Sequence, residues 1–141
     1  MLDVLDSYKE KGSFNFSIND RLSQVCTAPK HSSGIYVIYA DVIKAENLIY
    51  IGISGRQDSN GEIIHRKDGI GGRIVKGKQF GDGRRRSWPK KMQEDNIKVL
   101  RVKWFITYGE YNKQFPRPIE YKMLEKILSE NGCLPLWNKK V

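Results

Sequence analysis

The chain is poor in the residues that build metal centres and disulfide frameworks. Its 141 residues include two cysteines and two histidines. Cys26 and Cys133 stand outside any Cys-x-x-Cys pair, so together with His31 and His65 they cannot complete a Cys/His zinc site at a usual spacing. We therefore expect both cysteines to be reduced thiols in the core of a cytoplasmic protein.

Long apolar runs are absent too, and the N-terminus lacks the features of a secretory signal. The apolar stretches are far shorter than the ~20 residues of a membrane-spanning helix. Asp3 and Asp6 stand where a signal peptide would carry basic residues ahead of an apolar segment. With 39% hydrophobic and 29% charged residues, the composition is that of a globular chain. We expect one cytoplasmic domain over residues 1–141 with no membrane partner.

Acidic residues are scarce in one segment, and the positive charge of the chain collects there. The net charge is +9. Residues 65–91 contain ten basic and two acidic side chains, whereas residues 1–64 contain six basic and eight acidic ones. A dense basic cluster with Trp88 beside it is typical of a protein that binds a phosphate backbone. The residues expected to contact DNA are Lys76, Lys78, Arg84, Arg85 and Arg86.

Hydrophobic patterning predicts a small α/β domain. Residues 34–41 and 47–54 are rich in Ile, Val and Tyr and flank a short polar turn, which is typical of a β-hairpin. The first run is apolar on both faces, which indicates a central strand covered on both sides. Residues 97–109 alternate apolar with basic side chains and predict a third strand. The expected fold is a three-stranded sheet with an N-terminal hairpin, flanked by helices.

The spacing of apolar residues predicts helices on both sides of the hairpin. Residues 1–31 are interpreted as an N-terminal helical extension, and residues 55–68 as a polar excursion after the second strand. A glycine ends the last helix. The expected helices cover residues 2–11, 18–26, 70–80, 87–95 and the segment from 119 to the stop at Gly132.

Two tripeptides on the expected hairpin carry the functional signal. Gly34-Ile35-Tyr36 lies in the first strand and Tyr50-Ile51-Gly52 in the second. In these residues the chain resembles the GIY-YIG nuclease family, which is named after the same two tripeptides. The family pattern continues with an Arg on the next helix, a Glu on a later helix and an Asn near the end of the domain. The matching residues here are Arg73, Glu120 and Asn138.

The resemblance implies a divalent-metal-dependent endonuclease that hydrolyses phosphodiester bonds of DNA. Tyr36 would be the general base or part of its relay, and nearby cations would assist it, because the ordinary pKa of tyrosine is about 10. Tyr50 would orient water or phosphate, and Arg73 would stabilise the charge of the transition state. Glu120 would hold one divalent cation, with Mg²⁺ favoured at an oxygen-ligand site, and Asn138 would contribute to DNA binding.

Two glutamates on the last predicted helix compete for the metal. At ~100° per residue, Glu120 lies at the centre of the apolar stripe, whereas Glu125 falls about 140° away. A carboxylate within a buried stripe needs a metal or an arginine as its partner, which favours Glu120. Glu125 stays as the alternative, because its spacing to Asn138 is more usual for the family.

The chain departs from the family at one catalytic position. Many members carry His, Tyr or Lys one turn after the helix Arg, where this chain has Gly77, so His65, Lys76 or Lys78 is a candidate substitute. The resemblance leaves open a stand-alone restriction-type enzyme and a structure-specific repair or mobile-element nuclease, as a monomer or a homodimer. The alternative from another class is a non-catalytic nucleic-acid-binding module on the same fold. None of these interpretations requires an organic cofactor.

Overall fold

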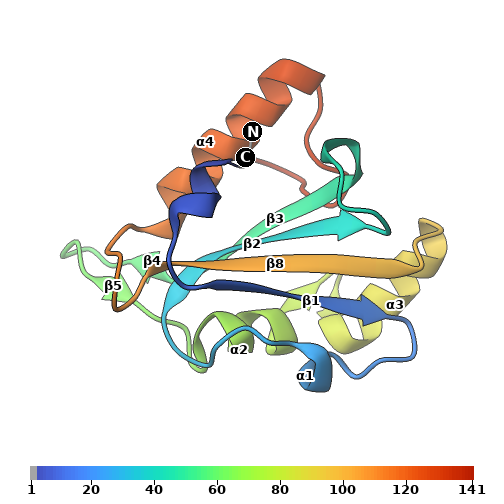
Figure 1. The fold of residues 1–141 in the computed structure, drawn as a ribbon, viewed down its shortest axis with the longest axis horizontal. Coiled ribbons are helices and arrows are strands. Elements are labelled where there is room, and N and C mark those ends of the chain that lie inside the picture. The colour runs from blue at the N-terminus through green and yellow to red at the C-terminus, as the bar shows by residue number, and fades with distance from the viewer. Residues whose placement is uncertain (1–2) are drawn as a thin grey trace.

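An antiparallel sheet forms the centre of the protein (Figure 1). The computed structural model describes residues 3–141, and its largest sheet has four strands in the order β1-β8-β2-β3. Every neighbouring pair in this sheet is antiparallel. The strands are β1 (Lys11–Ser17), β2 (Ser33–Ala40), β3 (Leu48–Ser54) and β8 (Val99–Tyr108).

Strand β2 lies inside the sheet, between β8 and β3. Seven of its eight residues are buried, and successive side chains alternate between the two faces of the sheet. Tyr36 and Ile38 pack into the core on one face, whereas Ile35, Val37 and Tyr39 pack into the core on the other. The prediction of a central strand covered on both sides is confirmed.

Short helices cover the face of the sheet that carries Tyr36. They are α1 (Leu22–Val25), α2 (Gly69–Lys76) and α3 (Arg84–Glu94). A small hairpin of β6 (Lys78–Gln79) and β7 (Asp82–Gly83) joins α2 to α3. α2 and α3 confirm the two helices expected here with shifted bounds, because the chain leaves α2 at Lys76 to form β6. The α2 and α3 residues in this core are Ile70, Ile74, Trp88 and Met92.

The opposite face is covered by α4 (Pro116–Asn131) and by a short 3-10 helix, η1 (Asp3–Ser7). The core on this face contains Leu5 from η1 and Met123, Leu124 and Ile127 from α4. α4 ends where Gly132 adopts a left-handed conformation with φ 76°, so the predicted glycine stop is confirmed. The remaining short elements are η2 (Ala45–Asn47), β4 (Arg56–Gln57) and β5 (Ile63–Ile64).

The N-terminal helices expected from the sequence are largely wrong. Residues 11–17 form β1, a fourth strand that pairs along β8, with Phe14 opposite Val102 and Phe16 opposite Leu100. Burial alternates at Phe14 and Phe16, as it does in a strand with one face on the core. Helical structure is limited to η1 and α1, and residue 2 of the first expected helix lies outside the described residues.

The two cysteines are free, but they do not share the buried environment expected for them. Cys26 is half-buried and Cys133 is exposed. The core prediction is wrong for Cys133, because the chain turns at Gly132 and leaves Cys133 at the surface. Across residues 3–141, no helix combines the length and the apolar character that crossing a membrane would require.

Candidate active site and basic hollow

The β2–β3 register brings the two motif tyrosines together. Tyr36 lies opposite Gly52, and Tyr50 lies opposite Ile38, so both tyrosine rings project from the same face, with centroids 5.9 Å apart. A Cβ atom at Gly52 would lie 2.6 Å from Cε2 of Tyr50 and closer still to the Tyr36 ring. The glycine of the second tripeptide therefore provides the space in which the two rings meet.

The glycine of the first tripeptide has a different role. Strand β8 approaches Gly34 so closely that a Cβ atom there would overlap the carbonyl oxygen of Phe105. The β2–β8 pairing shifts register next to Gly34, between Ser33 and Gly34. A side chain at this position would push β8 away from β2, so this glycine holds the strand carrying Tyr36 inside the sheet.

A buried guanidinium lies against the tyrosine pair. The Arg84 side chain is fully buried, and its Nη2 donates a hydrogen bond of 2.7 Å to the Tyr36 hydroxyl oxygen. Its Nη1 donates to the carbonyl oxygen of Arg73 at 2.9 Å, and its Nε donates to Oε1 of Gln79 at 3.2 Å. Arg84 is thus a component of the site and not of the solvent-exposed surface.

This position corrects the prediction that Arg84 contacts DNA together with Arg85 and Arg86. Only Arg85 and Arg86 are exposed. α3 begins at Arg84, three residues before its expected start, so Arg84 shares the buried helix face of Trp88 and Met92. The four-residue spacing from Arg84 to Trp88 to Met92 was the available signal, and it was missed because the helix was expected to begin at residue 87.

Arg73 lies where α2 ends beside the tyrosines. It is half-buried, and its guanidinium lies against Gly77, which has no side chain. A Cβ atom at Gly77 would lie 2.7 Å from Nη1 of Arg73 and 3.2 Å from Nη1 of Arg84. Two arginine side chains therefore occupy the space into which a side chain at position 77 would project.

The environment of Tyr50 keeps its hydroxyl protonated. Burial raises the pKa of Tyr50 above its ordinary value, and the neighbouring Tyr36 raises it further. Arg84 and Arg73 oppose this rise in the pKa but do not cancel it. Tyr50 is therefore a hydrogen-bond donor at neutral pH.

A pocket of about 330 Å³ connects Tyr50 with the first turns of α4. Glu120 lines the pocket, is 7% exposed and forms an ion pair with Arg117. Burial raises the pKa of Glu120 above the ordinary value, although the hydrogen bond and charge of Arg117 act in the opposite direction. Glu125 is exposed beside Tyr121, outside this pocket. Of the two glutamates, Glu120 is the one that the fold brings to Tyr50.

Asn138 also lines the pocket, but its side chain is engaged by the backbone of β3. Its Oδ1 accepts a hydrogen bond from the N–H of Ile51, and its Nδ2 donates to the carbonyl oxygen of Ile51, each at 3.0 Å. Both polar ends of the amide therefore have partners inside the protein. This geometry gives Asn138 a structural role at β3, and the DNA contact expected for it stays a prediction. A contact between a side chain and a distant backbone has no signature in the sequence.

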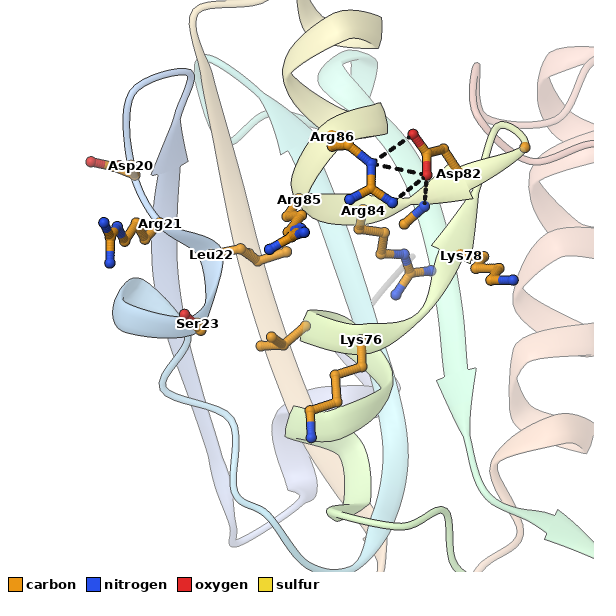
Figure 2. A pocket seen from close by; sticks show the side chains of 13 residues that line it. Asp20, Arg21, Leu22, Ser23, Lys76, Lys78, Asp82, Arg84, Arg85 and Arg86 are labelled. Atoms are coloured by element: carbon orange, nitrogen blue, oxygen red, sulfur yellow. Dashed lines mark hydrogen bonds and ion pairs between the residues drawn. The ribbon is translucent and has the colours of Figure 1, made fainter.

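A second concave region, the basic hollow, lies between α1, α2 and the start of α3 (Figure 2). Its volume is about 1030 Å³. Its lining includes two acidic residues, Asp20 and Asp82, together with the cations Arg21, Lys76, Lys78, Arg84, Arg85 and Arg86.

The cations of the basic hollow differ in how far they are already neutralised. Arg86 forms an ion pair with Asp82 at 2.7 Å, and the hydrogen bonds from Arg86 and from the Gly83 N–H lower the pKa of Asp82 to about 2. Lys76 pairs with Asp68 at 3.3 Å. Of the exposed cations of the hollow, Arg21, Lys78 and Arg85 form no ion pair within residues 3–141. These three cations are the ones most available to an anionic ligand.

The contacts of His65 are with Ser33 and Tyr108. Its Nδ1 lies 2.6 Å from Oγ of Ser33, and its ring packs edge-on against Tyr108 with centroids 6.0 Å apart. Lys76 and Lys78 line the basic hollow. Of the side chains around Gly77, it is Arg84 that hydrogen-bonds Tyr36.

The carboxylate of Glu120 is the group in this pocket that could hold a divalent cation. A hard carboxylate oxygen suits Mg²⁺, which binds proteins through one or two carboxylates and takes its other ligands from water and phosphate. In the part of the chain that the structure describes, no three His, Cys, Asp or Glu side chains gather around a common point. The residues present therefore fit a site with one carboxylate that the substrate completes.

Known proteins do not add to this assignment. No protein-family model matches the chain, and neither a curated protein nor a solved structure matches it.

Proposed function

We propose that the protein is a divalent-metal-dependent endonuclease that hydrolyses phosphodiester bonds of DNA, as its resemblance to the GIY-YIG nucleases implies. The observation that carries the proposal is the pairing of Tyr36 with Tyr50 against a buried guanidinium, with Tyr50 and Glu120 lining one pocket. Phenols, a carboxylate and arginines supply the proton acceptor, the ligand oxygen and the positive charge that this hydrolysis needs.

The two tyrosines take different roles because their exposure differs. Tyr36 is fully buried, whereas Tyr50 is half-buried and lines the pocket. Tyr50 is therefore the tyrosine that contacts the attacking water or the phosphate. Because its pKa is raised, Tyr50 is protonated at neutral pH and gives up its proton to Tyr36 only as it receives one from the water. Tyr36 is the inner member of this proton relay.

Positive charge next to the tyrosines stabilises the transition state. The charge of Arg73 acts on Tyr50, so it also acts on a phosphate that Tyr50 contacts. Glu120 would hold the divalent cation, and Mg²⁺ bound there supplies a Lewis acid for the phosphate oxygens. Tyr50, Arg73 and Glu120 thus orient the water, neutralise the phosphate and retain the metal.

The basic hollow supplies the contacts that hold DNA near this pocket. The β6–β7 hairpin contributes Lys78 to the hollow and Gln79 to the Tyr50 pocket, so the two regions lie on either side of one hairpin. A DNA backbone that crosses the hairpin contacts the free cations Lys78 and Arg85 with two phosphate groups and the Tyr50 pocket with a third. These contacts fix the position of the DNA without reading its sequence.

A plasmid-cleavage assay tests the proposal. The wild-type protein should nick or cut plasmid or branched DNA with Mg²⁺ and stop when EDTA is added. Tyr50→Phe and Tyr36→Phe should each lower the cleavage rate by about 100-fold, the scale of one proton-transfer group. DNA binding should persist in both variants, because the hydroxyl groups serve the chemistry. Cleavage at the wild-type rate by both variants would contradict the relay.

A non-catalytic nucleic-acid-binding module is the second candidate function, and one observation favours it. Arg117 already neutralises Glu120, so this carboxylate has a partner without any metal. A protein that binds plasmid and branched DNA but cuts neither with Mg²⁺ would support this module and contradict the endonuclease.

A further inference from the structure

Arg84 carries a buried positive charge without a negative partner. Its side chain is fully buried, and its three hydrogen bonds go to neutral oxygens on Tyr36, Arg73 and Gln79. No carboxylate among residues 3–141 forms an ion pair with it. Burial of an unpaired charge is costly, and folded proteins retain such a charge where another group can balance it.

Aromatic rings offset part of this cost. The guanidinium carbon lies 5.3 Å from the Tyr36 ring centroid, 6.0 Å from that of Tyr50 and 5.2 Å from that of Trp88. Each distance allows a cation–π interaction. Of the three oxygens that accept hydrogen bonds from Arg84, the Tyr36 phenol is the one that can lose a proton and become an anion.

The fold fixes the direction of the guanidinium. Oε1 of Gln79 accepts hydrogen bonds from Nε of Arg84 at 3.2 Å and from Nε1 of Trp88 at 2.9 Å. The backbone N–H of Arg84 donates to the carbonyl oxygen of Gly77 at 3.1 Å. The α2 terminus, the β6–β7 hairpin and α3 thus hold the Arg84 side chain against Tyr36, in the space left open by Gly77.

We propose that Arg84 is a positioning residue that stabilises Tyr36 as a phenolate, so that the buried tyrosine can accept the proton released by the attacking water. This role rests on the proposed endonuclease function. Arg84, at the start of α3, would thus substitute for the side chain that is missing at Gly77. The candidates from the sequence were His65, Lys76 and Lys78.

The hydrolysis step balances with Tyr36 as the proton acceptor. The oxygen of the attacking water forms a bond to phosphorus, and the bond from phosphorus to the leaving oxygen breaks. The proton lost by the water goes to Tyr50 as Tyr50 passes its own proton to the Tyr36 phenolate. The leaving oxygen takes a proton from solvent water, and Tyr36 returns its proton to solvent through Tyr50 before the next turnover. Arg84 keeps its protons throughout, because guanidinium does not deprotonate in proteins.

Replacing Arg84 by an uncharged side chain of similar length tests this role. In Arg84→Met the kcat for Mg²⁺-dependent cleavage should fall by about 100-fold, because Tyr36 loses the positive charge that stabilises it as a proton acceptor. The Kd for DNA should stay unchanged. The loss should shrink as the pH rises, since solvent hydroxide then replaces the relay. A merely structural role would lower activity equally at every pH. Arg84→Lys, which keeps the charge, should retain more activity than Arg84→Met and serves where Arg84→Met does not fold.

Arg101→Met is the matched control for the loss of a guanidinium. Arg101 lies on β8, away from the tyrosine pair. Its Nε donates to the carbonyl oxygen of Asp41 at 2.7 Å. This variant should lose stability but keep the wild-type kcat. A kcat for folded Arg84→Met within threefold of wild type, while wild type cuts DNA, would overturn the role of Arg84 and leave the proposed function standing.

A measurement without DNA keeps the two proposals separable. Ultraviolet absorbance counts tyrosinate, and Arg84→Met should form less tyrosinate than wild type at the same alkaline pH. In a Tyr36→Phe background the Arg84→Met change should have no such effect. An unchanged tyrosinate content in Arg84→Met, or a difference that persists without the Tyr36 hydroxyl, would overturn the proposal whether or not the protein cuts DNA.

Discussion

The side chain of Asn138 forms both of its hydrogen bonds with the backbone of Ile51. β3 is an edge strand of the sheet. Trp137, the residue before Asn138, also contacts it, because its backbone N–H donates to the carbonyl oxygen of Ile49 at 2.7 Å. Tyr50 lies between these two anchoring points. The C-terminal segment therefore completes the edge of the strand that carries Tyr50.

Loss of the Asn138 amide should destabilise the protein more than it weakens DNA binding. Asn138→Ala leaves the N–H and C=O of Ile51 without partners, so we expect the free energy of unfolding to fall by about 1–3 kcal/mol. Asn138→Asp should also destabilise, because a carboxylate cannot donate to the Ile51 carbonyl oxygen. Denaturant unfolding measures both effects. Unchanged stability with weaker DNA binding would instead make Asn138 a DNA contact.

Glu120→Gln and Glu125→Gln should have different effects on cleavage. Glu120 faces the Tyr50 pocket, so its amide variant should lose Mg²⁺-dependent cleavage, because it loses the charge that a cation requires. Glu125 is exposed on α4, and its amide variant should cut DNA like wild type. A paired plasmid-cleavage assay at a series of Mg²⁺ concentrations compares them. The reverse pattern would mean that Glu125, and not Glu120, is the metal ligand.

The raised pKa of Glu120 makes a separate prediction about stability and pH. The folded protein holds this proton more tightly than the unfolded chain, whose glutamate pKa is about 4.3. The stabilisation that results is complete below that unfolded value and is lost as the pH rises through the raised value. Glu120→Gln lacks this titration.

Unfolding measured across the acid range checks this dependence. The stability of wild type relative to Glu120→Gln should decrease as the pH rises above about 4.3 and then level off. A wild-type curve that gains stability relative to Glu120→Gln over the same range would mean that Arg117 outweighs burial.

Removal of two of the unpaired cations of the basic hollow should reduce the salt dependence of DNA binding. Changing Lys78 and Arg85 together to Ala should lower the slope of log Kd against log salt by about two units, if each contacts one phosphate. Arg86→Ala should change the slope less, because Asp82 already neutralises Arg86. Fluorescence anisotropy with labelled duplexes at several salt concentrations measures the slope.

Two comparisons make the salt experiment specific. Lys122 is an exposed cation on α4 that forms no ion pair within residues 3–141 and lies outside the hollow, so Lys122→Ala should leave the slope unchanged. Two duplexes of different sequence should be affected equally, because phosphate contacts do not distinguish bases. A loss confined to one duplex would mean that Lys78 or Arg85 reads base edges.

The sequence predicted the three strands whose apolar pattern is strong, and it missed β1, where the pattern is weak. In β1 the exposed positions hold Lys11, Ser13 and Asn15, and the buried side chains are Phe14 and Phe16 alone. Two aromatic residues do not establish a period of two against the helical spacing on either side. Pairing with β8, a contact between distant segments, determines the structure of these residues.

The same distinction between local pattern and distant contact applies to the candidate site. The proximity of Tyr36 and Tyr50 follows from a hairpin register, which is local and therefore predictable. The environment of Glu120 follows from helical phase, and the sequence separated it correctly from Glu125. The burial of Arg84 depends on where α3 begins and on how Gly77 leaves space. Those features arise from the packing of α2, β6, β7 and α3.

The order of strands in the sheet has a consequence for how the chain folds. β2 and β3 are neighbours in the sequence, so the two tyrosines can meet in a local hairpin, but a two-stranded hairpin is marginally stable alone. β1 pairs with β8 alone, and these strands are separated by most of the chain. Closing such a long loop makes folding slow. During synthesis, β1 therefore stays unpaired until β8 has been made.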